Sequence, residues 1–415
     1  MISDIGQHSA YVWVLLPEQP EPVVCGRVSG RGPGADAIHD FVYGRSYRER
    51  REAIPLTPHD LPLEPREMTT RRGLHGVLRD AAPDAWGRRV LIHRLGMRAE
   101  QAESELTEID YLLLSTQTRP GALQFHDNPD QPPQPGVITA DLELTSSAVE
   151  AVEQGHPLPP DLEAALAHGT SIGGARPKAL VQHEGERCIA KFASTTDVHP
   201  MVRLEHLALI LAEQAGIEPV SSRRTSVLGK DVLLIRRFDT TDTDGIEYRR
   251  HFFSALTALE LDEMTARYAG YPELADYLRR YGRKPVQACR MLFRRMVFNI
   301  LIGNTDDHAR NHALFWDGRQ IELTPAFDLS VIPRVGQEAS QAMEVGNQGS
   351  RSTLSNALSQ CARFGLTADE ATELAEELHT VIREGWLDAC DQAEIPETDR
   401  QRLMGTAVLS PAVLR

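Results

Sequence analysis

Lysine and cysteine are scarce in this sequence of 415 residues, and it has no long apolar run. Only four of its 44 basic residues are lysines, and its five cysteines are scattered without CxxC spacing or a Cys/His ligand pattern. Such cysteines argue against a zinc site and favour buried free thiols in a reducing compartment. No apolar run, the short stretch at residues 297–302 included, approaches the roughly 18–20 residues that a membrane span needs.

The charge balance is acidic, with 59 acidic residues against 44 basic ones and a formal net charge of −15. Such a chain repels phosphate overall, which argues against stand-alone binding to nucleic acid and favours a basic partner. A hydrophobic content of 41% excludes global disorder, and the length predicts two or three packed units. Residues 1–10 lack the features of a secretion signal, so we expect a cytoplasmic protein.

Residue patterns predict a β-rich part followed by a helical part, with a cleft between them. We expect an α+β protein with a Pro-rich linker at residues 126–138. The expected strands are 10–16, 23–28 and 231–236, together with a hairpin over 181–192 around a Glu184-Gly185 turn. The expected helices are 74–95, 99–114, 202–215, 291–302 and 374–386, and the chain should be almost wholly helical after about residue 250.

Polar residues follow the apolar helix at 291–302 and the Gly303 stop. Asp306 and Asn311 lie five positions apart, and Asp328 comes after a short predicted hairpin at 312–323. This spacing matches the catalytic loop and metal-binding Asp of protein kinases, where an Asp orients the hydroxyl and hard oxygens hold Mg²⁺. The alternative is a helix end with Asx-turn residues and an unrelated Asp.

A Gly-rich segment, residues 171–181, runs into a predicted strand. Small residues let backbone N–H groups approach phosphate oxygens, and Arg176 or Lys178 can add positive charge. The segment is not a Walker loop, since Gly-Lys-Ser/Thr before a helix is absent. A simple turn is the alternative.

Lys191 lies within a predicted strand, and Glu205 follows at the start of the next helix. This order is that of the kinase lysine and its helix glutamate, although a solvent-facing edge lysine is the alternative. The strand leading to Asp239 could be a hinge that offers backbone groups to adenine, or an ordinary core strand.

Taken in order, these segments resemble the HipA-type serine/threonine kinases, the toxins of type II toxin–antitoxin pairs. The resemblance covers nearly the whole chain. It rests on LRDAAPDAWGR (residues 78–88), PGALQF (120–125), SIGGARPK (171–178), IAKF (189–192), RRFD (236–239), GNTDDHARN (303–311) and PAFDL (325–329). It implies a bilobal protein-kinase-like fold with an N-terminal subdomain at 1–125, a kinase N-lobe at 139–240 and a helical C-lobe at 241–415.

The resemblance also implies residue roles. Asp306 would be the catalytic Asp, Asn311 and Asp328 the Mg²⁺ ligands, and Ser171 the autophosphorylation site whose modification switches the kinase off. The implied nucleotide contacts are Ile172, Gly173, Gly174, Ala175, Arg176, Pro177, Lys178, Lys191, Arg236, Arg237, Phe238, His308 and Asp328. Many relatives carry Glu at the position of Arg236, which puts a side-chain contact with adenine there in question.

The implied activity is ATP- and Mg²⁺-dependent phosphorylation of a translation component, with an aminoacyl-tRNA synthetase expected, and consequent growth inhibition. A HipB-like helix-turn-helix antitoxin would neutralise the toxin, and DNA would be contacted only through that complex. Two alternatives stay open. One is a small-molecule phosphotransferase of the aminoglycoside-kinase type, and the other is a pseudokinase corepressor, against which the intact Asp306, Asn311, Asp328 and Lys191 argue.

Overall fold

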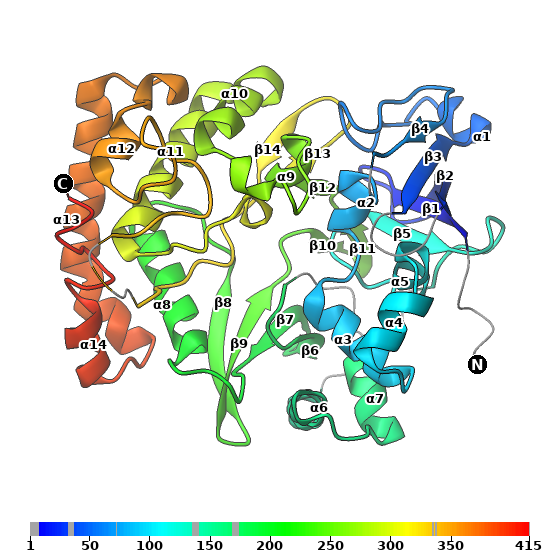
Figure 1. The fold of residues 1–415 in the computed structure, drawn as a ribbon, viewed down its shortest axis with the longest axis horizontal. Coiled ribbons are helices and arrows are strands. Elements are labelled where there is room, and N and C mark those ends of the chain that lie inside the picture. The colour runs from blue at the N-terminus through cyan, green and yellow to red at the C-terminus, as the bar shows by residue number, and fades with distance from the viewer. Residues whose placement is uncertain are drawn as a thin grey trace. The chain divides into compact units, whose positions relative to one another are not determined.

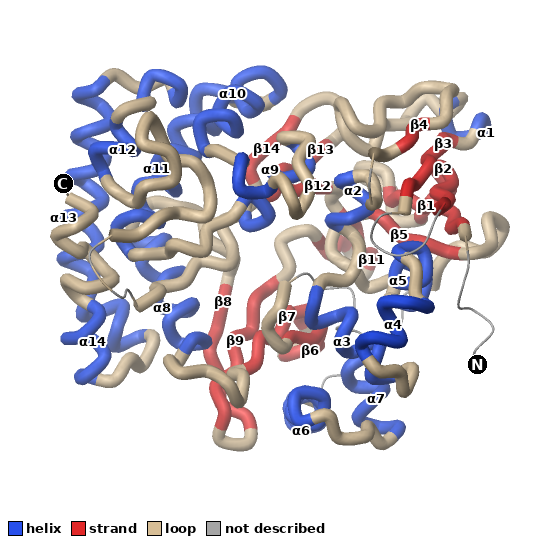
Figure 2. The backbone as a smooth tube through the Cα atoms, viewed as in Figure 1, coloured by secondary structure: helices blue, strands red, loops and turns tan. Residues whose placement is uncertain are grey.

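The computed structural model describes residues 8–31, 37–71, 73–134, 141–167, 174–333, 336 and 338–414. The chain forms two compact units, and its elements are labelled in Figure 1. The first unit comprises Met1–Asp197, Thr225–Phe253 and Trp316–Gly318, and the second comprises Val198–Arg224, Ser254–Phe315 and Arg319–Arg415. Strands are concentrated in the first unit and helices in the second (Figure 2). Within the described ranges, no helix is both long and apolar enough to cross a membrane.

An antiparallel five-stranded sheet opens the first unit, in the order β4-β3-β2-β1-β5. The β1–β2 hairpin confirms the strands predicted from β-branched and aromatic residues at 10–16 and 23–28. The other three strands were not predicted. The strands are β1 Ser9–Leu15, β2 Pro22–Arg31, β3 Ile38–Tyr43, β4 Met68–Thr69 and β5 Leu123–His126.

Two helices expected to be continuous are each divided in the structure. The stretch 74–95 forms α2 and α3, because Pro83 lies between them and the residue before a proline avoids helical dihedrals. The stretch 99–114 forms α4 and α5, because Thr107 and Asp110 make a capping box that starts a new helix. The helices are α1 Arg45–Arg48, α2 Gly76–Asp80, α3 Ala85–Arg94, α4 Ala99–Glu105 and α5 Glu108–Leu114.

A second, four-stranded sheet has the order β6-β7-β9-β8. Its β6–β7 hairpin confirms the turn predicted at Glu184-Gly185. One face of this sheet, including Ala179, Val181 and Ala190, packs in a core with α6, α7 and Trp86 of α3. The elements are α6 Leu142–Gln154, α7 Pro160–Ala167, β6 Lys178–His183, β7 Glu186–Phe192, β8 Ser222–Val227 and β9 Lys230–Arg236, followed by the hairpin β10 Thr240–Thr243 and β11 Ile246–Arg249.

The second unit is built mainly from helices, as predicted for the chain after about residue 250. The helix α11 packs against α10 and α13, and α13 also packs against α8. The helices are α8 Met201–Gln214, α9 Ala255–Ala258, α10 Tyr271–Tyr281, α11 Pro285–Ile302, α12 Leu354–Leu358, α13 Ala368–Gln392 and α14 Glu397–Leu403, with short 3₁₀ turns at Ala266–Tyr268, Ala309–Asn311 and Cys361–Phe364. A small sheet has the order β12 (Phe252–Ser254), β13 (Ala313–Trp316), β14 (Ile321–Leu323), and its β13–β14 hairpin was predicted.

The helix α11 fixes the start of the predicted catalytic loop. Its central and C-terminal turns are almost entirely buried, and it ends at Gly303, whose φ of 73° lies in the left-handed region that glycine adopts at little cost. The polar residues after Gly303 therefore project from the end of a rigid, buried helix.

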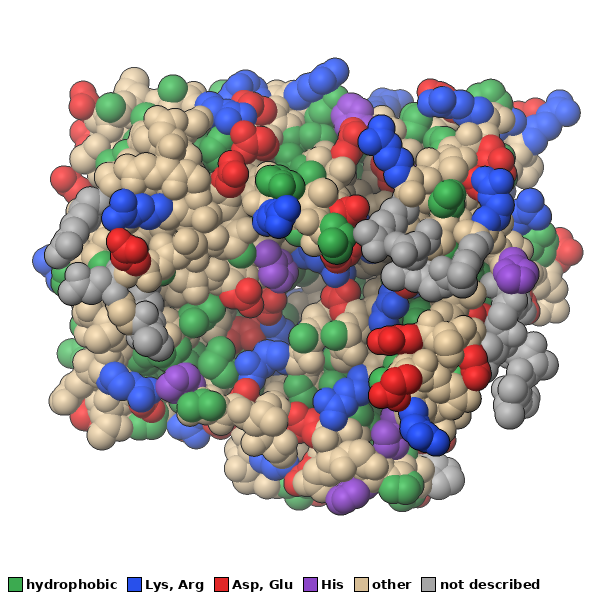
Figure 3. Space-filling view, in the orientation of Figure 1, with side chains coloured by type: hydrophobic (Ala, Val, Ile, Leu, Met, Phe, Trp, Pro, Cys, Tyr) green, Lys and Arg blue, Asp and Glu red, His purple; other side chains and the backbone are tan. Residues whose placement is uncertain are grey.

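The described surface carries charges of both signs. On the face drawn in Figure 3, acidic and basic side chains lie interspersed among the described residues. The five cysteines lie in the described part of the chain, are buried and form no disulfide, as expected from their scattered positions.

Candidate active site

Two of the four lysines face each other across the β6–β7 hairpin. Lys178 and Lys191 are direct partners in the antiparallel register, so their side chains lie on the same face of the sheet. Lys178 is buried, with 5% of its surface exposed, and Lys191 is half-buried. Two ammonium groups on one face of a sheet can both donate to the oxygens of one bound anion.

The lysine pair shares its sheet face with apolar side chains. Leu180 pairs with Ile189, Ile189 pairs with Ile235 on β9, and Lys191 pairs with Leu233. These residues alternate with the core-facing residues of the same strands, so they lie on the opposite face from that core. This face therefore combines apolar side chains with two ammonium groups, a chemistry suited to an aromatic base that carries phosphates.

The lysine pair was not foreseen, although the sequence contains its signal. Glu184 and Gly185 have φ values of 50° and 84°, the double positive φ of the two-residue turns preferred in hairpins. A two-residue turn fixes the register, and each lysine lies six positions from its own side of that turn. Counting residues along each strand from the predicted turn would have shown that Lys178 and Lys191 are cross-strand partners.

The structure describes the C-terminal part of the predicted phosphate loop, Gly174–Lys178. Ser171, Ile172 and Gly173 lie outside the described residues. Gly174 has a φ of 110°, and a Cβ atom there would overlap Lys178 Nζ, so the lysine ammonium lies directly against the glycine backbone. The Arg176 guanidinium forms an ion pair with Asp197, and the Pro177 carbonyl accepts a hydrogen bond from the Phe192 amide, 3.0 Å away. The loop therefore ends against β7.

The predicted hinge residues have three different surroundings. Arg236 is exposed and lies 3.6 Å from Glu186, while the Phe238 ring packs on Phe252 with centroids 5.5 Å apart. Arg237 is buried, and its Nε donates to Asp239 Oδ1 at 3.0 Å. Since the Arg237 side chain is committed to this contact, a nucleotide contact by this residue would have to use its backbone.

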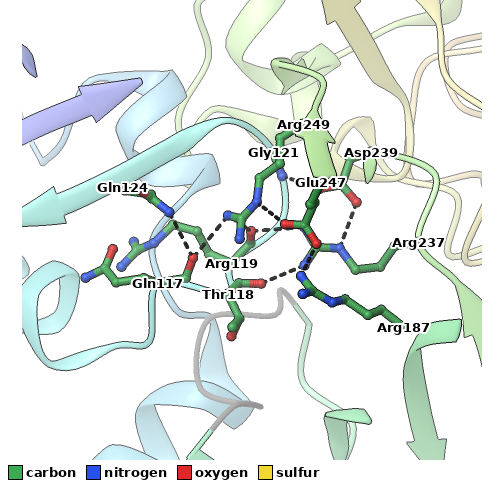
Figure 4. Close-up of polar contacts among 10 residues, drawn as sticks. All are labelled: Gln117, Thr118, Arg119, Gly121, Gln124, Arg187, Arg237, Asp239, Glu247 and Arg249. Carbon is green, nitrogen blue, oxygen red and sulfur yellow. Dashed lines mark hydrogen bonds and ion pairs between the residues drawn. The ribbon is translucent and has the colours of Figure 1, made fainter. Parts of the chain in front are cut away.

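Arg237 belongs to a buried polar cluster that holds the loop before β5 (Figure 4). Its Nη1 donates to the Thr118 carbonyl at 2.8 Å, and Arg249 Nη1 donates to the Gln117 carbonyl at 3.0 Å. Asp239 Oδ2 accepts a hydrogen bond from the Gly121 amide at 2.6 Å. The RRFD segment thus binds the backbone of residues 118–121, where the PGALQF segment begins.

In the second unit, the predicted catalytic loop joins Asp306 to Asn311. Asn311 Nδ2 donates to the Asp306 carbonyl at 3.3 Å, which brings the two residues to one side of the loop. At the start of the loop, Asn304 Nδ2 donates to Asn299 Oδ1 of α11 at 3.1 Å. The loop is therefore anchored to the helix that precedes it.

Asp328 lies close enough to Asp306 for their charges to interact. Partial burial raises the pKa of Asp306, and the negative charges of Asp328 and Asp307 add to this effect, while His308 opposes it. Asp328 has a φ of 58°, an uncommon conformation for a residue other than glycine and one that concentrates at functional sites. Repulsion between two carboxylates is relieved by a bound cation.

The donor set here suits Mg²⁺. Asn311 and Asp328 supply the hard amide and carboxylate oxygens that this ion prefers, and Mg²⁺ commonly takes only one or two carboxylates plus phosphate oxygens. Among the described residues, no three His, Cys, Asp or Glu side chains gather into a metal site by themselves.

Asp307 supports the loop from inside the protein, a role that the sequence did not reveal. Its Oδ2 accepts hydrogen bonds from Asn299 Nδ2 at 2.7 Å, from His312 Nε2 at 2.8 Å and from the Tyr271 hydroxyl. Burial acts to raise the pKa of Asp307, but the charge and hydrogen bond of His312, with the Tyr271 hydroxyl, lower it overall. The carboxylate is therefore ionised and fully engaged.

Lys191 and Glu205 belong to different units. Glu205 is buried on α8, with 8% of its surface exposed. Their pairing stays a prediction.

The sequence matches two protein families. Residues 170–386 match the HipA-like C-terminal domain, and residues 26–126 match the HipA N-terminal domain. A curated protein of Sinorhizobium fredii (strain NBRC 101917 / NGR234), named "Putative kinase Y4mE", is 27% identical over 243 residues, which are 53% of this chain and 54% of that protein. The chain thus spans about half the length of this curated relative.

Solved structures resemble the fold. HipA of Shewanella oneidensis MR-1, from a toxin–antitoxin complex with HipB and operator DNA, aligns with a TM-score of 0.67 and 18% identity, covering 95% of this chain and 96% of that one. The Helicobacter pylori proinflammatory kinase CtkA aligns with a TM-score of 0.37 and 15% identity over 56% of this chain. The first likeness confirms the predicted α+β kinase-like fold.

Proposed function

Because this chain belongs to the HipA family, we propose that it is an ATP- and Mg²⁺-dependent kinase that phosphorylates serine or threonine hydroxyls of a protein. The observation that carries the proposal is the Lys178–Lys191 pair beside apolar side chains on one sheet face. A base, a sugar and a chain of phosphates match that combination. In the second unit, Asp306, Asn311 and Asp328 are the residue types that phosphoryl transfer requires.

The role proposed for each residue follows the resemblance to HipA-type kinases and agrees with the chemistry of its side chain. Lys178 and Lys191 bind phosphate oxygens, and His308 contacts the nucleotide. Asp306 accepts or orients the proton of the attacking hydroxyl. Asn311 and Asp328 would hold Mg²⁺, which would neutralise charge on the phosphates when bound.

The biological role proposed for this kinase is that of a toxin. The related Shewanella HipA was solved with HipB and operator DNA, and a net charge of −15 suits a basic DNA-binding partner. We therefore propose neutralisation by a HipB-like helix-turn-helix antitoxin, with DNA reached only through that complex. The target would be a translation component such as an aminoacyl-tRNA synthetase, in the cytoplasm, and autophosphorylation at Ser171 would end the activity.

Transfer of labelled phosphate from ATP tests the kinase proposal. The full chain should label itself and a protein of a bacterial extract in the presence of Mg²⁺, and Asp306→Gln should lower the rate by about 10²–10⁴-fold. Equal labelling by wild type and Asp306→Gln would contradict the assignment. Transfer to an aminoglycoside alone would instead support a small-molecule phosphotransferase.

Growth assays test the toxin role. Expression of the wild-type chain should arrest growth, Asp306→Gln should not, and co-expression of a neighbouring helix-turn-helix protein should restore growth. Arrest that persists in Asp306→Gln would show that toxicity does not depend on phosphoryl transfer.

A further inference from the structure

The start of α3 contacts the described end of the phosphate loop at three points. The Gly174 amide donates to Asp84 Oδ2 at 2.6 Å, and the Gly174 carbonyl accepts from the Trp86 amide at 3.3 Å. The indole Nε1 of Trp86 donates to the Lys178 carbonyl at 2.9 Å. These hydrogen bonds hold both ends of the segment Gly174–Lys178.

The α3 side of this contact is rigid without help from the loop. Trp86 is 2% exposed and packs in the core beneath the β6–β7 hairpin. Arg88, one half-turn further along α3, makes two hydrogen bonds of 2.9 and 2.6 Å to the Glu108 carboxylate and lies 4.3 Å over the Tyr111 ring. Side chains fixed in this way can hold a partner within a narrow range of positions.

The Asp84 carboxylate does not cap the helix that it precedes. Asp84 is the N-cap residue of α3, where Asp usually accepts a hydrogen bond from the helix's own first turn, but it makes no such capping bond. Its carboxylate accepts from Gly174 instead. Capping therefore does not account for the acidic side chain at this place, whereas contact with the loop does.

The contact joins the two family domains. Asp84 and Trp86 lie in the segment 26–126 that matches the HipA N-terminal domain, and Gly174 and Lys178 lie in the segment 170–386 that matches the HipA-like C-terminal domain. The PDAWGR and SIGGARPK motifs thus meet in space.

We propose that Asp84 and Trp86 are positioning residues through which the N-terminal domain raises nucleotide affinity by ordering the segment Gly174–Lys178. The inference rests on the proposed kinase function. A loop segment loses conformational entropy when it becomes ordered. Hydrogen bonds that order it beforehand reduce the cost of ordering at the moment of binding, and so raise affinity. They also fix Lys178, whose ammonium lies against Gly174.

Calorimetry of the full chain with Mg²⁺ and a non-hydrolysable ATP analogue tests the proposal. Asp84→Ala and Trp86→Phe should each weaken binding about three- to tenfold, the effect expected for one lost hydrogen bond. Asp84→Asn keeps an acceptor oxygen and should retain most of the affinity. Wild-type or higher affinity in both Asp84→Ala and Trp86→Phe would overturn the proposal.

Trp316→Phe is the matched control for Trp86→Phe. Trp316 Nε1 donates to the Pro55 carbonyl at 2.7 Å, so this variant also loses one indole hydrogen bond, partly buried, within the first unit. Its nucleotide affinity should equal that of wild type. If it falls as far as that of Trp86→Phe, the effect is general destabilisation and the positioning role is wrong.

Hydrogen exchange separates this inference from the kinase proposal. Amides of residues 174–183 should exchange faster in Asp84→Ala and Trp86→Phe than in wild type without any nucleotide present. Unchanged exchange would overturn the positioning role. If wild type binds no nucleotide, the kinase proposal fails, and faster exchange in the variants would still show that α3 orders this segment.

Discussion

His312 Nε2 donates a hydrogen bond to Asp307 Oδ2 across 2.8 Å inside the second unit. The lowered pKa of Asp307 makes its carboxylate an acceptor, which assigns the proton to the imidazole. Asp307 directly follows Asp306, and His312 directly follows Asn311. One buried contact therefore ties together both ends of the segment that carries the proposed base and a proposed metal ligand.

We expect Asp307→Asn to damage stability and transfer together. It replaces a buried, ionised acceptor of three hydrogen bonds, so the free energy of unfolding should fall by about 1–3 kcal/mol. Displacement of Asp306 and Asn311 should lower the transfer rate by about 10–100-fold. Urea denaturation and phosphate transfer at a temperature where the variant is folded measure the two effects.

Asp369 is exposed and lies in the same unit, so Asp369→Asn is the control for this substitution. It should change neither the unfolding free energy beyond about 0.5 kcal/mol nor the rate. An Asp307→Asn variant that keeps wild-type transfer would show that the buried network does not position the loop.

The lysine pair predicts a loss of nucleotide binding when either lysine is replaced. Lys178→Met and Lys191→Met should each bind Mg·ATP more than about tenfold more weakly, because a charge-assisted hydrogen bond is lost. Calorimetry with Mg·ATP measures both affinities.

Lys230→Met is the matched control for the lysine pair, since Lys230 lies on β9 and forms an ion pair with Glu150 at 3.0 Å. Its Mg·ATP affinity should equal that of wild type. Unchanged nucleotide affinity in both Lys178→Met and Lys191→Met would show that this sheet face does not bind the nucleotide phosphates.

A double-mutant cycle tests the predicted pair of Lys191 and Glu205. The variants Lys191→Met and Glu205→Gln should show a coupling of about 0.5–3 kcal/mol in nucleotide affinity, because residues in one ion pair are not independent. Additive effects would indicate that Lys191 acts without Glu205.

Stability should fall in mild acid because of His251. Burial lowers the pKa of His251 to about 4, while an unfolded His has a pKa near 6.5. As the pH falls below about 6.5, the unfolded chain takes up a proton that the folded chain does not accept. The free energy of unfolding should therefore decrease between about pH 6.5 and pH 4, by about 3 kcal/mol from this residue.

Urea denaturation over this pH range measures that slope. His251→Gln removes the proton uptake and should flatten it, while His183→Gln on β6 serves as the control for the substitution itself. An equal slope in wild type and His251→Gln would show that His251 does not govern acid sensitivity.

Local patterns were enough to find the elements that carry the motifs. The β6–β7 hairpin, α8, α11 and the β13–β14 hairpin lie where turn residues and apolar periodicity predicted them. The β10–β11 hairpin was missed, although Asp244-Gly245 at its turn is a strong hairpin signal, because its strands are polar. The likeness to HipA confirms the kinase-like fold that the motif order implied.

Contacts between distant segments could not be predicted in this way. Asp307 looked like one more loop carboxylate, and its burial depends on Tyr271, 36 positions earlier in the chain. The contact of Asp84 with Gly174 spans 90 positions. Spacing within a motif reports local geometry, whereas the partner of a buried polar group depends on how separate segments pack.

The buried cluster around Arg237 makes the C-terminal domain depend on the N-terminal domain for its stability. A fragment that encodes only residues 170–386 would retain Arg237, Asp239 and Arg249 but lose the backbone of residues 117–121 that they bind. The guanidinium and carboxylate groups that contact this backbone would then face solvent or remain buried without partners. The free energy of unfolding of the fragment should fall by several kcal/mol. A chimaera that joins the N-terminal domain of one relative to the C-terminal domain of another would need residues that fit each other in this cluster. We therefore expect the two domains to be inherited together.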